Sequence, residues 1–395
     1  MKIAILGTRG VPPTYGGFET FAAELGVRLV ARGHEVVVYS REIENNGGRV
    51  PRREELWHGI HRVVLPAFGG KYFETVSHAL ISAIDALGRD FDAVLVCNAA
   101  NAFVIPLLRA ARIPVAINVD GIERKRRKWN IAGRAVYTIG EAVSAGFANE
   151  VVADAEVIAR YYARHYGVRT VTIPYGADFP EEEDSDVLAR LGLTARNYIL
   201  YVSRFEPENN PLEVVEAYER IADCGLRIEE GTRAHAVPQS SILNPQSARP
   251  TLVMLGKGLY AADLVRRLHA HRNDQVLFPG ALYGRDYRTL QRNALLYIQA
   301  TEVGGTHPAL IEAMASGGCV LAHDTPENRE VGGDAVGYFT LRPDTLAGTL
   351  REWLSNPRLR EDFRARARKR ARERYSWEKV TEEYEGMLGR LRAEG

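Results

Sequence analysis

Short apolar runs alternate with segments of helical periodicity from the first residues of the chain onward. Residues 2–6 have the pattern of a buried strand, a loop rich in Gly and Pro follows, and Phe18 begins a helical pattern that ends at Gly33. Further strands are predicted at 36–39, 93–97, 115–119, 151–153 and 170–173, and helices at about 75–88, 102–111, 136–149 and 156–166. Strands and helices in alternation predict a doubly wound α/β domain built on a parallel sheet.

The same alternation restarts after residue 178. Strands are predicted at 198–203, 251–255, 276–278, 295–299, 319–322 and 336–339, and helices at about 211–222, 260–272, 284–294, 308–316 and 344–354. We therefore predict one domain over 1–177, a second of the same class over 178–375, and a C-terminal helix over 376–395 that crosses back to the first domain. Residues 223–250 lack periodicity and form an insertion of unassigned role.

Composition limits the class of protein. The 395 residues include 51 Lys and Arg against 50 Asp and Glu, a net charge of +1 that does not suit a dedicated nucleic-acid binder. The three cysteines (Cys97, Cys224 and Cys319) are isolated, which favours a reducing cytoplasm and provides no metal knuckle. No apolar run approaches the ~18–20 residues of a membrane span, so we expect a soluble or peripheral protein.

Charge is divided unevenly between the two predicted domains. Residues 1–178 contain 22 basic and 18 acidic residues (+4), whereas residues 179–395 contain 29 and 32 (−3). The first domain is therefore expected to meet an anionic partner such as a membrane surface. The basic stretch over 358–374 has no aromatic interleaving, and we interpret it as a solvated or membrane-facing helix rather than a nucleic-acid site.

Two strand-to-helix loops are candidates for binding an anion. Gly16 and Gly17 stand directly before the first helix, where glycines let a phosphate or sugar approach the helix amides. Arg204 occupies the equivalent place in the second domain and could contact a diphosphate in a bidentate manner. The alternatives are a bare turn at the glycines, and an Arg204 that pairs with Glu206 or Glu208 on the surface.

The richest segment lies between the predicted strand at 295–299 and the helix that follows. Gly304, Gly305 and Thr306 lead into that helix, whose first-turn amides form a further anion site. Glu312 lies in an otherwise apolar helical pattern, so its carboxylate needs hydroxyl or cation partners unless that face is solvated. Ribose hydroxyls would suit it. His307 is interpreted as a helix-start residue rather than a general acid.

Asp120 ends a predicted strand and is placed at the ligand-binding edge of its sheet. The basic run from Arg124 to Lys128, beside Trp129, could hold a phosphate or a membrane surface, although a solvated face is the default for such a run. Asp184 and Asp186 form a D-x-D pattern inside an acidic run that we interpret as solvated. No His pairing suggests a metal site.

These segments, in this order and spacing, resemble retaining nucleotide-sugar glycosyltransferases of family 4 with the GT-B fold, in which two Rossmann-like domains face a central cleft. The resemblance covers nearly the whole chain. It rests on Tyr15-Gly16-Gly17-Phe18-Glu19, residues 173–178, Val202-Ser203-Arg204, Glu312-Ala313-Met314-Ala315-Ser316-Gly317 and Tyr375-Ser376-Trp377. Gly7-Thr8-Arg9-Gly10, Asn118-Val119-Asp120-Gly121, Pro207-Glu208-Asn209-Asn210 and Gly304-Gly305-Thr306-His307-Pro308 resemble more closely the bacterial rhamnosyltransferase-like subgroup.

The resemblance implies transfer of rhamnose from dTDP-rhamnose, with retention and without a metal or other cofactor, to a lipid-linked saccharide in cell-surface polysaccharide synthesis. A cytoplasmic protein at the inner face of the membrane is expected. It implies catalytic roles for Asp120 and Arg204. The implied donor-binding residues are Gly16, Gly17, Arg204, Asn209, Gly304, Gly305, Thr306, His307, Ala309, Leu310 and Glu312. The implied acceptor-binding residues are Arg9, Tyr15, Asp120, Glu123, Arg124 and Trp129.

Two positions depart from the broader family pattern. A second family Glu falls on Gly304, with Glu302 two residues too early to replace it, and a family Lys falls on Asn209. Both departures put the usual donor-sugar contacts in doubt and suit a sugar with a different hydroxyl pattern. A UDP- or GDP-sugar donor, a sugar phosphorylase or epimerase, and a non-catalytic sugar-nucleotide binder stay open. An NAD-dependent oxidoreductase is disfavoured because neither domain begins with G-x-G-x-x-G.

Overall fold

The computed structural model describes residues 1–13, 16–41, 52–68, 70–126, 129–179, 184–222, 249–258 and 261–394. The chain divides into two compact units. Unit 1 consists of Met1–Gly176, Val303–Pro308 and Tyr375–Gly395, and unit 2 consists of Ala177–Glu302 and Ala309–Arg374. Tyr15, residues 127–128, the acidic residues 181–183 and residues 223–248 of the predicted insertion lie outside the described residues.

Unit 1 is built on an eight-stranded sheet with the order β3-β4-β2-β1-β5-β6-β7-β8. The strands are β1 (Lys2–Leu6), β2 (Glu35–Arg41), β3 (Arg53–Trp57), β4 (Ile60–Leu65), β5 (Ala93–Cys97), β6 (Val115–Asn118), β7 (Glu150–Ala153) and β8 (Val171–Thr172). The helices are α1 (Gly17–Ala31), α2 (Gly70–Ala86), η1 (Ala99–Val104), α3 (Ile105–Ala110), η2 (Glu123–Lys125), α4 (Ile131–Phe147), α5 (Glu156–Tyr166) and α14 (Trp377–Glu394). Strands β5 and β6 are buried along their whole length, and β1 is buried after Lys2, because helices cover both faces of the sheet.

The hairpin of β3 and β4 was not predicted from the sequence. β3 pairs with β4 in antiparallel orientation, so the sheet is mixed, whereas a purely parallel sheet was expected. The sequence of β3, REELW, is polar and mostly exposed because the strand lies at the sheet edge and has no apolar face to show. The turn at His58 and Gly59 has positive φ at both residues, as a two-residue hairpin turn requires.

Unit 2 contains a six-stranded parallel sheet with the order β11-β10-β9-β12-β13-β14. The strands are β9 (Tyr198–Val202), β10 (Thr251–Leu255), β11 (Val276–Gly280), β12 (Leu296–Gln299), β13 (Val320–His323) and β14 (Gly337–Phe339). The helices are α6 (Val187–Arg190), η3 (Pro207–Asn209), α7 (Pro211–Ala222), α8 (Ala262–His269), α9 (Gly284–Asn293), α10 (Pro308–Ala315), α11 (Pro326–Gly332), α12 (Pro343–Ser355) and α13 (Pro357–Arg374). The predicted fold class, two α/β domains with doubly wound sheets, is confirmed.

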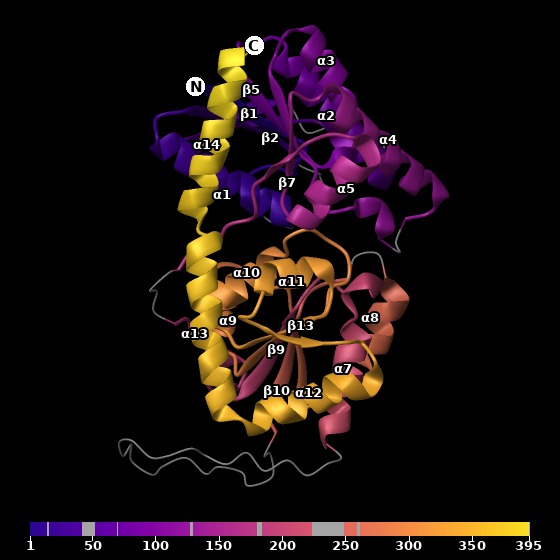
Figure 1. Cartoon of the computed structure of the whole chain (residues 1–395), viewed down its shortest axis with the longest axis vertical. Coiled ribbons are helices and arrows are strands. Elements are labelled where there is room, and N and C mark those ends of the chain that lie inside the picture. The colour runs from indigo at the N-terminus through magenta and orange to yellow at the C-terminus, as the bar shows by residue number, and fades with distance from the viewer. Residues whose placement is uncertain are drawn as a thin grey trace. The chain divides into compact units, whose positions relative to one another are not determined.

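The last helix, α14, packs on α1 within unit 1, as Figure 1 shows. Phe21 of α1 lies 5.2 Å, centroid to centroid, from Tyr384 of α14. The Arg32 guanidinium donates to the Glu385 carboxylate at 2.6 Å, and the His34 ring contacts the same carboxylate at 2.7 Å. These contacts join the C-terminal helix to the first helix of the chain.

Candidate active site

Two aspartates stand where neighbouring strands of unit 1 end. Asp120 follows β6 and Asp154 follows β7, and the two strands pair in parallel, with Asn118 opposite Val152. Asp120 has a positive φ of 54°, and its N–H donates to Asn118 Oδ1 at 2.9 Å. Asn118 Nδ2 donates in turn to the hydroxyl of Tyr384 at 2.8 Å. Asp120 is therefore fixed at the carboxyl edge of the sheet, where ligands bind in such folds.

The side chains of Asp120 and Asp154 are hydrogen-bonded to each other. Asp154 is fully buried. Burial first, and then the negative charge of Asp120, raise the pKa of the Asp154 carboxyl well above its ordinary value. Asp154 therefore keeps its proton at pH values at which an exposed aspartate has lost it. Asp154 was not singled out in the sequence, although it directly follows a predicted strand in the same way as Asp120.

The loop Val303–Pro308 supplies further partners of this aspartate pair. The backbone N–H of Thr306 donates to Asp154 Oδ2 at 2.7 Å, and its hydroxyl lies 3.1 Å from the same oxygen. Tyr175 N–H donates to the Thr306 hydroxyl at 3.3 Å. Asp154 thus contacts both Asp120 and Thr306. The resemblance assigned Asp120 to catalysis and Thr306 to donor binding.

Glycines make this close approach of backbones feasible. A Cβ atom placed on Gly121 would lie 2.5 Å from the carbonyl carbon of Gly304, and one on Gly305 would lie 1.9 Å from Asp154 Oδ1. Both distances are too short for any side chain. A Cβ on Gly304 would also lie 2.3 Å from His307 Nε2, so the His307 ring occupies the space that a larger residue at 304 would need.

The glycines before α1 belong to the same unit. Helix α1 begins at Gly17 without a side-chain cap, which leaves first-turn amides for a ligand or for water. Glu19 Oε1 accepts the N–H of Arg9 at 2.9 Å and holds the loop after β1 against the helix. A Cβ on Gly17 would lie 3.5 Å from Pro308 Cγ and 3.7 Å from the Tyr175 hydroxyl. Tyr15 lies outside the described residues.

The other residues assigned to acceptor binding make contacts within unit 1. Glu123 is buried and accepts from Arg126 at 2.5 Å. Arg124 Nε donates to the Tyr161 hydroxyl at 3.0 Å. Trp129 packs on Tyr137 with ring centroids 5.2 Å apart. These side chains hold η2 and α4 in place, and the basic run is in part structural rather than a solvated face.

In unit 2, Arg204 follows β9 with a side chain that is 39% exposed. Its guanidinium lies 3.8 Å from Glu206, a long ion pair that gives partial support to the surface-pair alternative. Asn209 is buried, and its Nδ2 donates to the Arg204 carbonyl at 2.6 Å. The Asn209 side chain thus supports the loop that carries Arg204.

Glu312 lies on α10 and faces α9. The Tyr287 hydroxyl donates to Glu312 Oε2 at 2.6 Å and accepts from Gln291 Nε2 at 2.7 Å. Burial and the Glu312 charge raise the pKa of Tyr287 well above its ordinary value, so the phenol keeps its proton as a donor. The hydroxyl partner that this carboxylate was expected to need is thus supplied in part by the protein. The i, i+4 spacing of Tyr287 and Gln291 in a predicted helix was the available signal.

The remaining assigned residues begin α10. Leu310 is fully buried and could contact a ligand only through its backbone, whereas Ala309 is partly exposed.

Asp184 of the D-x-D pattern accepts from Arg292 at 2.6 Å, and Asp186 pairs with Arg190 at 3.0 Å. Among the residues that the structure describes, no three His, Cys, Asp or Glu side chains are arranged to hold a metal ion. Over the same residues, no helix is both long and apolar enough to cross a membrane.

Comparison with known proteins gives two family matches in chain order. Residues 15–179 match the model described as Glycosyltransferase Family 4, and residues 188–370 match Glycosyl transferases group 1. No curated protein sequence matches the chain.

Solved structures share the fold at low sequence identity. Sucrose-phosphate synthase from Thermosynechococcus elongatus is 17% identical, with all of both chains covered and a TM-score of 0.78. Anabaena Alr3699/HepE in complex with UDP-glucose is 16% identical, with 98% of this chain and 99% of that chain covered and a TM-score of 0.73. A glycosyltransferase from Rickettsia africae is 13% identical, with 99% and 98% covered and a TM-score of 0.70. The two family matches and the shared GT-B fold together identify the chain as a glycosyltransferase of the family 4 type.

Proposed function

We propose that the protein transfers rhamnose from dTDP-rhamnose, with retention and without a metal ion, to a lipid-linked saccharide at the inner face of the cytoplasmic membrane. The observation that carries the proposal is the Asp120 carboxylate. It is fixed at the edge of the sheet, lies beside the buried Asp154, whose pKa is raised, and is joined through that residue to the loop before α10.

The donor would be held by groups of opposite charge or matching polarity. Arg204 and the first amides of α10 would bind the diphosphate, since a helix N-terminus carries a partial positive charge. Glu312, oriented by Tyr287, would accept the ribose hydroxyls. Gly16 and Gly17 would allow the donor to approach the start of α1. Because these groups stabilise the leaving phosphate, transfer should not require a divalent cation.

In the proposed reaction, the bond between the anomeric carbon and the leaving phosphate oxygen breaks while the acceptor oxygen bonds to the same face of that carbon. The acceptor proton passes to the departing phosphate, so no enzyme nucleophile is needed. Asp120 would orient the acceptor and stabilise the positive charge that develops on the sugar. Asp154 would act as a positioning residue that keeps Asp120 ionised.

Two features of the loops favour a donor with an unusual hydroxyl pattern. His307 occupies the space beside Gly304, and the Asn209 amide is engaged by the Arg204 carbonyl. The carboxylate and the cation of the broader family pattern are therefore absent at these positions, which suits a deoxy sugar such as rhamnose. A UDP-hexose donor is the second candidate, because Anabaena HepE, with the same fold, was solved with UDP-glucose.

Exposed apolar side chains support a membrane-linked acceptor. Val76, Leu80 and Ile84 recur every fourth residue along α2 and are 38%, 42% and 56% exposed. On α4, Ile131 and Ile139 are 88% and 63% exposed. Both helices belong to unit 1, in which the N-terminal segment has the positive net charge. An apolar face within a basic unit is typical of proteins that bind anionic membranes from one side.

The test compares donors and site variants. Thermal shift should show greater stabilisation by dTDP-rhamnose than by UDP-glucose or GDP-mannose. Asp120→Asn should lower turnover by about 100-fold or more with donor binding retained, and Glu312→Gln should weaken donor binding by about tenfold. EDTA should leave transfer unchanged, and the anomeric product should keep the donor configuration.

Different results would reject different parts of the proposal. Preference for UDP-glucose would overturn the rhamnose donor and support the second candidate. Phosphate-dependent release of a sugar phosphate would indicate a phosphorylase, and tight donor binding without turnover would indicate a sugar-nucleotide sensor. Unchanged turnover in Asp120→Asn would overturn the site assignment.

A further inference from the structure

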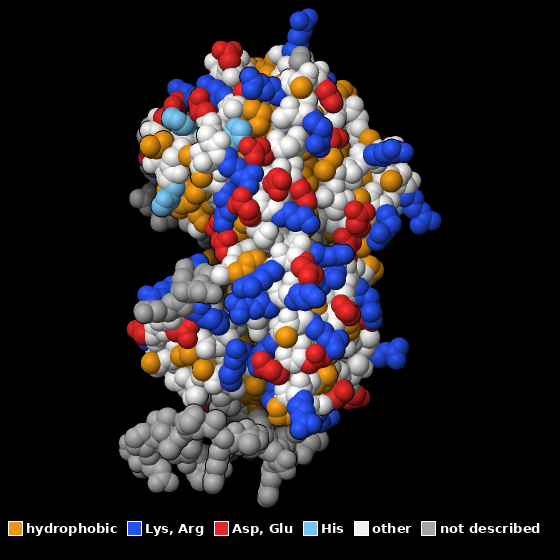
Figure 2. All heavy atoms as spheres, turned by 60° about the vertical axis from the view of Figure 1, so that its left-hand side comes forward, with side chains coloured by type: hydrophobic (Ala, Val, Ile, Leu, Met, Phe, Trp, Pro, Cys, Tyr) orange, Lys and Arg blue, Asp and Glu red, His pale blue; other side chains and the backbone are white. Residues whose placement is uncertain are grey.

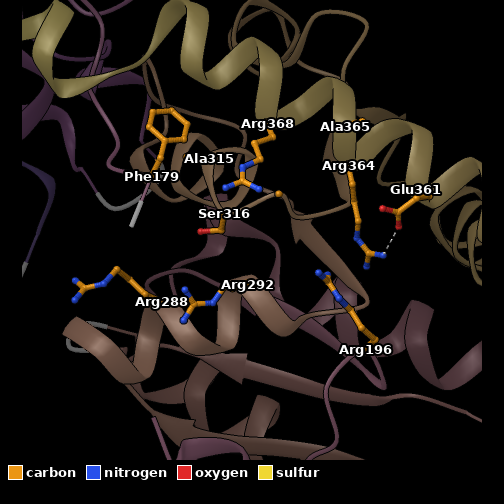
Figure 3. A pocket seen from close by; sticks show the side chains of 11 residues that line it. Phe179, Arg196, Arg288, Arg292, Ala315, Ser316, Glu361, Arg364, Ala365 and Arg368 are labelled. Carbon is orange, nitrogen blue, oxygen red and sulfur yellow. Dashed lines mark hydrogen bonds and ion pairs between the residues drawn. The ribbon is translucent and has the colours of Figure 1, made fainter. Parts of the chain in front are cut away.

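Unit 2 contains a pocket whose lining is dominated by arginine. It has a volume of about 360 Å³ and lies between α9, α13 and the C-terminal end of α10. Five arginines line it, Arg196, Arg288, Arg292, Arg364 and Arg368, together with Glu361. Figure 3 shows Arg364 and Arg368 reaching into the pocket from α13, with Arg288 and Arg292 on α9 opposite them. Figure 2 shows many Lys and Arg side chains on the face that carries α13.

Two of these guanidinium groups are held close together by backbone carbonyls. Arg364 donates to the carbonyl oxygens of Leu295 and Ala294 at 2.7 and 3.1 Å. Arg196 donates to the same Ala294 oxygen at 2.9 Å. A neutral carbonyl orients a guanidinium without cancelling its charge. Burial, and then the charge of Arg364, lower the pKa of Arg196, as expected for like charges in contact.

Within the described part of the chain, the carboxylates beside the pocket do not balance this charge. Glu361 lies 3.3 Å from Arg364, but its side chain is 77% exposed and stands at the rim. Asp184 accepts from Arg292 at 2.6 Å and is 44% exposed. Among the residues that the structure describes, and even without Arg288, four arginines face two carboxylates. Guanidinium groups that converge from two helices match the oxygens of a phosphate group, to which they donate parallel hydrogen bonds.

We propose that this pocket binds a phosphate-class anion, either a soluble diphosphate or the phosphate of a lipid headgroup, at a site separate from that of the sugar donor. The proposed donor phosphates meet the N-terminal amides of α10, whereas the pocket begins at its last residue, Ala315. A cavity of this size is in the range of small-molecule sites. The inference does not depend on the identity of the donor sugar.

The test measures binding by titration calorimetry at constant ionic strength, with dTDP present in excess to fill the donor site. Inorganic diphosphate and monomeric dihexanoyl phosphatidic acid are the two ligands. The variants are Arg288→Gln and Arg368→Gln. The matched control is Lys369→Gln, which removes the same charge from α13 at a side chain that is 77% exposed and outside the pocket lining. Arg204→Gln serves as a donor-site variant.

We expect the affinity for the anionic ligand to fall about tenfold or more in Arg368→Gln and Arg288→Gln. Affinity should be unchanged in Lys369→Gln and Arg204→Gln. Binding of diphosphate alone would identify a soluble ligand, and binding of phosphatidic acid alone would identify a lipid headgroup. Absence of binding by both ligands would overturn the proposal, as would equal weakening by the control. If Arg288→Gln does not fold, Arg368 at the exposed rim decides the result.

Discussion

A carboxyl group taken out of water resists ionisation, and Asp154 shows how the fold can use that resistance. Its hydrogen-bond partners come from two parts of unit 1: Asp120 after β6, and the N–H and hydroxyl of Thr306 in the loop before α10. The protonated form of Asp154 places no second negative charge beside Asp120. Asp154 thus connects the end of β6 to the loop before α10 and, on the proposed function, positions Asp120.

The pKa of Asp154 has a consequence for stability. Because it is higher in the folded than in the unfolded chain, folding takes up a proton between the two values. The stability due to this group is complete below the unfolded pKa of about 4 and is lost as pH rises through the folded pKa. The difference in melting temperature, Asp154→Asn minus wild type, should therefore become more positive as pH rises from 4.5 to 8. Parallel curves for the two proteins would contradict this prediction. The exposed Asp90→Asn serves as the control.

At the scale of elements, the contact between the loop Val303–Pro308 and the β6 and β7 ends depends on glycine. Gly305→Ala should destabilise the fold and lower turnover by about tenfold or more, because its Cβ would overlap the Asp154 carboxylate. Gly146→Ala on α4 is the matched control. Its Cβ would meet nothing within 4 Å, so the change should stabilise the helix by about 0.5–1 kcal/mol. Chemical denaturation measures both, and an unaffected Gly305→Ala protein would show that the loop is not docked.

The contact between α14 and the sheet supports the same site. Tyr384→Phe removes the hydroxyl that accepts from Asn118, which is itself buried and fixes the N–H of Asp120. The buried Asn118 amide would lose a partner, at a cost of about 1–3 kcal/mol in the free energy of unfolding. Turnover should fall while donor affinity stays the same. Equal stability of the two proteins in urea would argue against a role for this hydrogen bond.

At the scale of the whole molecule, unit 1 has the positive net charge and most of the exposed large apolar side chains among the described residues. Vesicles that contain anionic lipid should sediment the protein at low salt and less of it at high salt, because screening weakens attraction between exposed charges. Ile139→Asp should reduce sedimentation at both salt concentrations, since it adds charge to the apolar face of α4. Asp90→Asn, which removes an exposed acidic charge, should not weaken sedimentation. Salt-independent binding would point to a purely apolar contact.

The sequence was sufficient for the two α/β domains because buried parallel strands leave clear apolar runs between amphipathic helices. It was insufficient at the sheet edge, where the polar strand β3 has no such signature. The same contrast holds at the site. Asp120 and Glu312 could be singled out by their position in a local pattern, whereas Asp154 and Tyr287 gain their roles from partners far along the chain. The arginine pocket likewise collects residues from five segments between 179 and 368.

The C-terminal segment Tyr375–Gly395 belongs to unit 1, and this affects how the chain folds during synthesis. At about 5–20 residues per second, α14 leaves the ribosome only after all of unit 2 has been made. Until then the aromatic face of Phe21 lacks Tyr384, and the Asn118 amide lacks its hydroxyl partner. Unit 2, whose own helices end at Arg374, is free of this delay. The first unit to be translated is therefore the second to be completed, and its uncovered apolar face is where a chaperone would be expected to bind the nascent chain.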